Sequence, residues 1–310
     1  MKRFLPHEEL ARDVRFKRTN SRNELFRSLP HDADGIVRVL EEVAPKIRER
    51  VEGTALEPVF DDLGPGFMIL TTAAGAAQTV DRTPLQLRAQ LHGIFVGELQ
   101  ALEAASRTVW DFPDAPWEFK MNMARQCWDE ARHVQIFEKL IDHVGGEVGE
   151  FPENTFLYET SCAEDPVLRV AGVNRCLEGL ACDAFRALIE YGKANDDDVV
   201  AQASDFVLAD ELTHVRFGSD WVKRFTADDP ERATRAKEFQ RETDARFAFG
   251  TRSVAREERL EAGFTEEELD ELDEILDQGP PRRILLEAAQ TLMERHRARS
   301  RGEDVPPLSA

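Results

Sequence analysis

The sequence predicts an all-α protein whose centre is a four-helix bundle, with additional helices before and after it. Ala, Leu, Glu and Arg dominate the chain and favour helices, whereas the alternating β-branched runs that are typical of strands are scarce. With 42% hydrophobic residues among 310, the chain can bury one sizeable core. We therefore expect a single domain over residues 1–300, with the bundle at about 84–225, and a flexible tail over 301–310.

Helix boundaries are marked by capping residues. Four starts combine a capping side chain with a proline or a glutamate at its usual place: Thr83-Pro84, Asp165-Pro166, Asp229-Pro230 and Thr265 with Glu268. Gly145-Gly146 is a typical helix stop. We predict long helices at about 84–110, 116–144, 166–194 and 197–225. Shorter helices are expected at about 34–52, 66–80, 230–248, 266–277 and 282–300.

Charge and cysteine content exclude several classes of protein. The 60 acidic and 40 basic residues give a formal net charge of −20, so the surface should repel nucleic acid and anionic membranes. Four cysteines with no CxxC pair are too few for a disulfide scaffold. The first residues lack the apolar run of a signal peptide, and no apolar stretch is long enough to cross a bilayer. We expect a cytoplasmic protein with reduced thiols.

Two Glu-x-x-His motifs lie inside the predicted long helices, one from Glu130 to His133 and one from Glu211 to His214. Residues three apart share one face of a helix, so each motif presents a carboxylate and an imidazole together. A single copy would be typical of a surface ion pair. Two copies in corresponding helices indicate a shared site.

Each motif has a glutamate opposite it in the preceding helix. Glu98 precedes Glu130 by 32 residues and Glu178 precedes Glu211 by 33, and the midpoints fall in the turns at 111–116 and 195–198. Residues equidistant from the turn of an antiparallel helix pair lie level with each other, so each glutamate should face a motif. Apolar neighbours at helical spacing place both glutamates on inner faces.

Four buried carboxylates and two imidazoles in one core would be strongly destabilising unless they bind cations. Two divalent ions would neutralise the four carboxylates. Oxygen ligands with one imidazole per ion suit Fe(II) or Mn(II), including a mixed pair, better than zinc, whose structural sites favour Cys and His. The predicted metal ligands, which would also form the catalytic centre, are Glu98, Glu130, His133, Glu178, Glu211 and His214.

These motifs resemble the ferritin-like di-iron carboxylate superfamily, in which two helices contribute one Glu each and two others contribute Glu-x-x-His. The segments that carry the resemblance are Gly97-Glu98, Trp128–Phe137, Cys176–Leu180 and Ala209–His214. They look most similar to ribonucleotide-reductase-small-subunit-like oxidases and oxygenases. The resemblance covers about residues 84–225 and implies a ferritin-like fold with two metal ions that react with O2.

The resemblance also implies residues around the ligands. In this superfamily an Asp directly before the motif Glu often hydrogen-bonds the ligand His of the other motif and orients its imidazole, which assigns that role to Asp129 and Asp210. The alternative is that both are ordinary solvated acids. Cys182, one turn after Glu178, stands where oxygenases of the superfamily often carry a small polar residue near the oxygen pocket. The alternative for Cys182 is a buried core thiol.

Three positions depart from particular branches of the superfamily. Phe137 stands where radical-type reductase subunits carry Tyr, Val173 where related ligand-binding oxidases carry a cross-linking Tyr, and Val207 where aromatic-amine N-oxygenases carry a third His. A reductase subunit is therefore not expected, and neither is the cross-link. An N-oxygenase would lack its extra ligand.

We expect a non-haem di-iron enzyme that uses O2 to hydroxylate, desaturate or N-oxygenate a small organic substrate. The chain has no GxGxxG or GxxxxGK[ST] motif, so we expect an external electron donor such as a redox partner; a homodimer is compatible with these expectations. One alternative is an iron-handling or peroxide-scavenging protein of ferritin or rubrerythrin type, which a shell-sized assembly would favour. Another is a helical interaction protein, in which Glu98 and Glu178 would be exposed.

Overall fold

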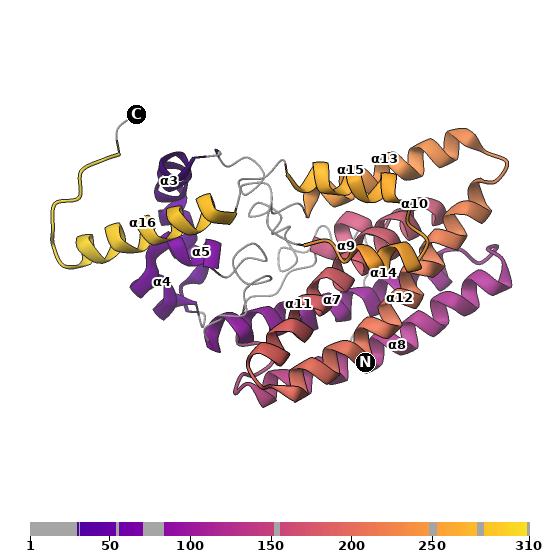
Figure 1. Ribbon diagram of the computed structural model, residues 1–310, viewed down its shortest axis with the longest axis horizontal. Helices are drawn as coiled ribbons and strands as arrows, with labels where there is room; N and C mark the ends of the chain where they lie inside the picture. Colours follow the sequence, from indigo (N-terminus) through magenta and orange to yellow (C-terminus); the bar gives the residue numbers. More distant parts are fainter. Residues whose placement is uncertain are drawn as a thin grey trace.

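The computed structural model describes residues 30, 32–53, 56–70, 84–151, 156–247, 253–277 and 282–308. These residues form helices joined by loops and contain no strand (Figure 1). The all-α prediction is therefore confirmed. None of the described helices combines the length and the hydrophobicity that crossing a membrane would need.

Four long helices pack together into what we call the bundle: α7 (Pro84–Asp111), α8 (Trp117–His143), α11 (Glu178–Ala194) and α12 (Asp198–Thr226). α7 packs along α8 and α11 along α12, as two helical hairpins, and α8 also contacts α12 (Figure 1). The bounds of α7, α8 and α12 lie within one residue of the predicted ones. The interior of the bundle is largely apolar, with Leu91, Phe137, Phe185 and Val215 fully buried.

The predicted helix at 166–194 is interrupted, which sequence periodicity did not indicate. It consists of α10 (Pro166–Val170), a π-helical turn η3 (Ala171–Leu177) and then α11, which begins at Glu178. A π-helical turn adds one residue to a helical repeat and so rotates the following residues relative to the preceding ones; such turns are frequent at functional sites. Here the turn ends directly before a predicted metal ligand.

The predicted helix ends are marked by the expected capping contacts. After α8, Gly145 has φ +75°, and Gly146 N–H donates to Ile141 O at 2.9 Å while Gly145 N–H donates to Asp142 O at 3.0 Å, which is a Schellman arrangement. Among the predicted caps, the side chains of Asp165, Asp229 and Thr265 accept from helix N-terminal amides, the last in a complete capping box with Glu268. The cap predicted at Thr83 lies outside the described residues.

Shorter helices cover the bundle. They are α9 (Phe156–Ser161), α13 (Pro230–Arg246), α14 (Arg256–Glu261) and α15 (Glu266–Leu276). α9 packs on α7 and η3, α13 on η3 and α12, and α14 on α11 and α12. α9 and α14 were not predicted, because six residues are too few for a clear helical period.

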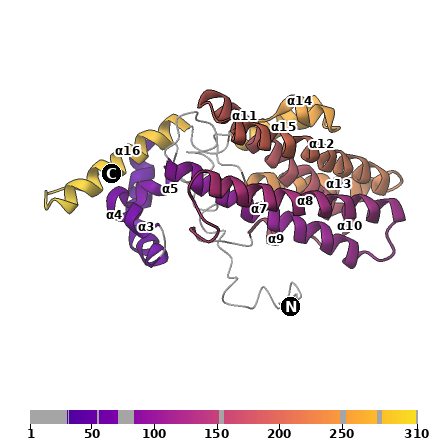
Figure 2. The ribbon, with the colours of Figure 1, turned by 90° about the horizontal axis from the view of Figure 1, so that it is seen from below.

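The remaining helices form a second apolar cluster beside the bundle (Figure 2). They are α3 (Ala33–Val51), α4 (Glu57–Leu63), η2 (Gly64–Gly66), α5 (Phe67–Leu70) and α16 (Arg282–Ser300). Their shared core includes Leu40, Phe60 and Leu292. The helix predicted at 66–80 is described only as far as Leu70, and residues 301–308 follow α16 without a further helix. The single-domain prediction for residues 1–300 stays a prediction.

Candidate metal centre

Six ionisable side chains from all four bundle helices meet in the core. Glu98 comes from α7, Glu178 from the first turn of α11, and the two Glu-x-x-His motifs from α8 and α12. Glu98 and Glu178 are 5% and 4% exposed, and the four motif residues are 0% exposed. The alternative in which these charges are solvated is therefore wrong, since it required Glu98 and Glu178 to be exposed.

The six residues form two groups that share two glutamates. Each group offers one ligand atom per residue within 4.8 Å of the others: Glu98, Glu130, His133 and Glu211 in one, and Glu130, Glu178, Glu211 and His214 in the other. Each group thus contains three carboxylates and one imidazole. Because Glu130 and Glu211 belong to both groups, they are the residues that could ligate an ion in either group. This buried cluster could hold metal ions.

The imidazole rings present the same nitrogen to the carboxylates. Nδ1 of His133 lies 3.1 Å from Glu130 Oε2 and 3.2 Å from Glu98 Oε2. Nδ1 of His214 lies 3.0 Å from Glu211 Oε2. The opposite nitrogens face aspartates, with His133 Nε2 3.2 Å from Asp210 Oδ2 and His214 Nε2 3.4 Å from Asp129 Oδ2. An Nε2–H that donates to Asp leaves the Nδ1 lone pair directed into the cluster, where a cation would bind.

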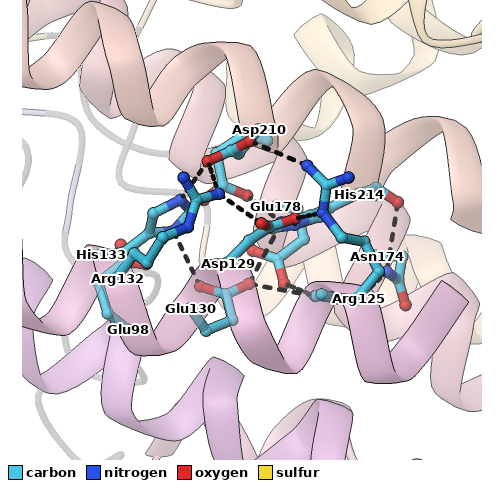
Figure 3. A network of polar contacts seen from close by, with 12 residues as sticks. Glu98, Arg125, Asp129, Glu130, Arg132, His133, Asn174, Glu178, Asp210 and His214 are labelled. Carbon is cyan, nitrogen blue, oxygen red and sulfur yellow. Dashed lines mark hydrogen bonds and ion pairs between the residues drawn. The ribbon is translucent and has the colours of Figure 1, made fainter. Parts of the chain in front are cut away.

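Two arginines of α8, Arg125 and Arg132, bridge these two aspartates (Figure 3). Arg125 Nε donates to Asp129 Oδ2 at 2.6 Å. Arg132 donates to Asp129 and, at 2.8 Å, to Asp210 Oδ2. Burial would raise the pKa of Asp129, but hydrogen bonds from His214 and both arginines outweigh it and lower that pKa to about 2. Asp129 is therefore ionised at neutral pH, where it accepts a hydrogen bond from His214 Nε2.

Burial and mutual repulsion set the protonation of the cluster itself. Burial, assisted by the neighbouring carboxylates, raises the pKa of Glu98 and of Glu178 well above their usual range. Burial would also raise the pKa of Glu130, but the imidazoles of His214 and His133 hold it well below its usual range. Burial would lower the pKa of both histidines, but Glu130 and Glu211, which face both imidazoles, raise it. In the absence of metal cations, protons on Glu98, Glu178 and the two histidines therefore offset the negative charge of the cluster.

A buried amide pair, which the sequence analysis missed, completes the surroundings. Gln126 Nε2 donates to Glu178 Oε1 at 2.6 Å and lies 3.3 Å from Glu130 Oε1. Asn174, in the π-helical turn, donates from Nδ2 to Gln126 Oε1 at 2.7 Å. Each amide stands four residues before a predicted ligand, Gln126 before Glu130 and Asn174 before Glu178. That spacing on an inner helix face was the signal that could have identified them.

The residues present fit a pair of metal ions. Oε1 of Glu211 is buried and, in the described part of the chain, has no hydrogen-bond partner, although it lies 3.2 Å from His133 Nδ1. A buried carboxylate oxygen without a donor is costly unless a cation fills that role. Glu211 is one of the two shared glutamates, so this oxygen belongs to a residue that both groups contain.

The three positions that depart from superfamily branches lie in apolar surroundings. Phe137 stacks on Phe185 with ring centroids 5.6 Å apart, and Val207 is fully buried in the same apolar cluster. Cys182 is also fully buried there, and burial raises the pKa of its thiol, which favours the reading as a neutral core residue. Val173 is buried in η3.

A protein-family model described as "Protein of unknown function (DUF455)" matches residues 68–270 of this chain. The chain belongs to the DUF455 family. The DUF455 segment contains the bundle, all six cluster residues, Asp129 and Asp210, and the amide pair, whereas α3, α4 and α16 lie outside it.

An uncharacterized protein of Haemophilus influenzae is 26% identical to this chain over 198 residues, which cover 60% of this chain and 68% of that protein. No solved structure matches the chain.

Proposed function

We propose that this DUF455 protein is a di-metal oxidoreductase that uses O2 to oxidise a small organic substrate. The observation that carries the proposal is the pair of buried four-residue groups that share Glu130 and Glu211. Two ions held side by side by shared carboxylates would supply the electrons and the Lewis acidity that O2 activation needs. The resemblance of the motifs to ferritin-like di-iron carboxylate proteins supports the same assignment.

The donor set favours iron or manganese. Three carboxylates and one imidazole per group are hard oxygen ligands with a single nitrogen, which suit Fe(II), Mn(II) or a mixed pair. Asp129 and Asp210 hold the histidines in the tautomer that presents Nδ1 to the ions. The surrounding apolar residues exclude water from the centre, as such chemistry requires. We propose that a separate redox partner delivers electrons, since the chain carries no nucleotide-binding motif.

The proposal is tested by metal content and O2 consumption of the purified protein. We expect about two iron or manganese ions per chain and O2 uptake when a chemical reductant is supplied. Glu130→Ala should lose both metal and O2 uptake, because Glu130 belongs to both groups. Glu138→Ala, on the exposed face of the same helix, is the matched control and should retain both.

Two results would contradict the proposal. One is a purified protein that holds neither iron nor manganese under reducing, metal-supplemented conditions. The other is a Glu130→Ala variant with full metal content and O2 uptake. Size-exclusion chromatography gives an independent check, because a shell-sized assembly that accumulates many iron ions per chain would indicate storage in place of substrate oxidation.

A further inference from the structure

The two halves of the bundle repeat the same ligands but differ one turn before them. Glu98 corresponds to Glu178, and the motif on α8 corresponds to the motif on α12. Four residues before the motif glutamates stand Gln126 in one half and Val207 in the other, both 0% exposed. Four residues before the single glutamates stand Asn174 in one half and Ile94 in the other. Gln126 and Asn174, one from each half, thus form an amide pair that contacts Glu178, whereas the two corresponding positions, Val207 and Ile94, are apolar.

The orientation of the amide pair is dictated by a backbone carbonyl. Asn174 Nδ2 lies 3.2 Å from the carbonyl oxygen of His214, which can only accept a hydrogen bond, so Asn174 must present its NH2 group there. The same NH2 group donates to Gln126 Oε1. Gln126 therefore turns its own NH2 group to Glu178 Oε1 at 2.6 Å. The chain of donors ends on Glu178 Oε1, with a second and longer contact of 3.3 Å from Gln126 Nε2 to Glu130 Oε1, and it is buried throughout.

Glu98 has no such support. In the described part of the chain, the carboxylate of Glu98 forms its hydrogen bond with Nδ1 of His133. That nitrogen is itself a predicted ligand atom. The corresponding positions on the other side, Val207 and Ile94, belong to or pack against the apolar cluster and cannot donate. Rotation of Glu98 therefore breaks only a contact with a nitrogen that a bound ion would occupy, whereas rotation of Glu178 breaks a buried hydrogen bond to an amide that is not itself a predicted ligand.

We propose that Gln126 and Asn174 make the two metal positions unequal. The position formed by Glu178 and His214 holds its ion tightly in a fixed coordination, and the position formed by Glu98 and His133 exchanges its ion and changes coordination. A ligand held in its bound geometry loses less conformational freedom on binding, and removal of such outer partners weakens metal affinity about 10–100-fold. This inference rests on the proposed metal centre, and it does not depend on the reaction with O2.

The experiment is a titration of the metal-free protein with Co(II), followed by visible absorption and by competition with a chelator. Wild-type protein should bind two ions in steps at least about tenfold apart in affinity. Glu178→Ala should remove the tight step and Glu98→Ala the weak one. Gln126→Leu should weaken the tight step about 10–100-fold and the weak step much less, because Gln126 reaches the other group only through its longer contact with the shared Glu130.

Gln100→Leu is the matched control. Gln100 is a buried glutamine on α7 whose amide bonds to Val96 O and Tyr158 N and to none of the cluster residues. The variant should keep the wild-type ratio of the two steps. Asn174→Ala is a second variant for the case in which Gln126→Leu does not fold; it frees the Gln126 amide and should weaken the tight step in the same direction.

The outcomes separate this inference from the proposed function. Two equal steps in wild-type protein, or a Gln126→Leu variant that weakens the Glu98 step instead, would overturn the inference and leave the metal centre intact. Two unequal steps in a protein that consumes no O2 with iron bound would leave the inference standing and contradict the proposed function. A protein that binds no Co(II) or Fe(II) would contradict both.

Discussion

Asp210 Oδ2 lies 3.2 Å from His133 Nε2, although 77 residues separate the two in the chain. The reciprocal pair, His214 and Asp129, is 3.4 Å apart. Each half of the bundle therefore orients the imidazole of the other half, and Arg132 joins the two aspartates. This crossed pairing makes the geometry of each proposed metal position depend on the helix that carries the other.

Replacing one aspartate should weaken one metal position more than the other. Asp210→Asn keeps the size of the side chain but removes the negative charge behind His133, so affinity at the Glu98 position should fall about 10–100-fold. Chelator competition measures the loss. Asp220→Asn, at an exposed position of the same helix, should change neither step. An Asp210→Asn variant with wild-type affinity at both positions would show that the pairing is only a surface contact.

The metal-free protein should lose stability as pH rises. Glu98 and Glu178 have folded-state pKa values raised above the unfolded value, because burial disfavours their charged forms. Above about pH 5 the unfolded state has released these protons while the folded state, with its raised pKa values, still retains them, so the free energy of unfolding falls as pH rises. Each group contributes up to about 1.4 kcal/mol per pH unit. Urea unfolding at several pH values measures the slope.

A variant and a metal ion each provide a control for that slope. Glu98→Gln has no ionisable group at this position. It should therefore make the fall of the unfolding free energy with pH less steep, by the contribution of one carboxyl group. Saturating Mn(II) should reverse the trend, since metal binding displaces protons and becomes stronger as pH rises. A metal-free protein whose unfolding free energy rises over this range would contradict the assigned protonation.

A side chain at Gly218 should destabilise the protein, because α12 packs directly against the π-helical turn at this residue. A Cβ on Gly218 would stand 2.6 Å from Asn174 Cβ and 3.2 Å from the backbone nitrogen of Arg175. Gly218→Ala should therefore cost about 1–3 kcal/mol of unfolding free energy and also weaken the tight metal step by displacing Asn174. Gly93→Ala is the matched control, since nothing lies within 4 Å of its Cβ position. It should stabilise α7 by about 0.5–1 kcal/mol.

Equal effects of the two variants on the unfolding free energy would contradict the close packing of Gly218 on Asn174.

Asp183 and Arg259 form a buried bidentate ion pair between α11 and α14, with contacts of 2.8 and 3.3 Å. Asp183→Ala would remove the carboxylate that is hydrogen-bonded to this guanidinium, which is 1% exposed, and leave Asp244 as its neighbouring negative charge; it should cost about 3–5 kcal/mol. Asp62→Ala breaks a bidentate pair with Arg297 whose side chains are 62% and 47% exposed, and should cost under about 1 kcal/mol. Thermal or urea unfolding compares the two, and a cost below about 1 kcal/mol for Asp183→Ala would contradict the role of the pair in holding α14.

Helix positions were predictable because their signals are local. Capping boxes, glycine stops and the apolar period act within a few residues, and they placed α7, α8 and α12 closely. Short helices such as α9 carry too few residues for a period, and the π-helical turn at 171–177 has no period of its own. The prediction of one uninterrupted helix over 166–194 failed for that reason.

The sequence by itself determined which six side chains meet. Glu98 and Glu130 are equidistant from one turn, Glu178 and Glu211 from another, and helical spacing adds each histidine to its glutamate. Only the tertiary structure decided what surrounds them. The contact between Asn174 and Gln126 joins residues 48 positions apart, and the crossed contacts of the histidines depend on α8 lying against α12. Such contacts follow from which helices become neighbours and how they are rotated, which side-chain packing sets and local sequence does not.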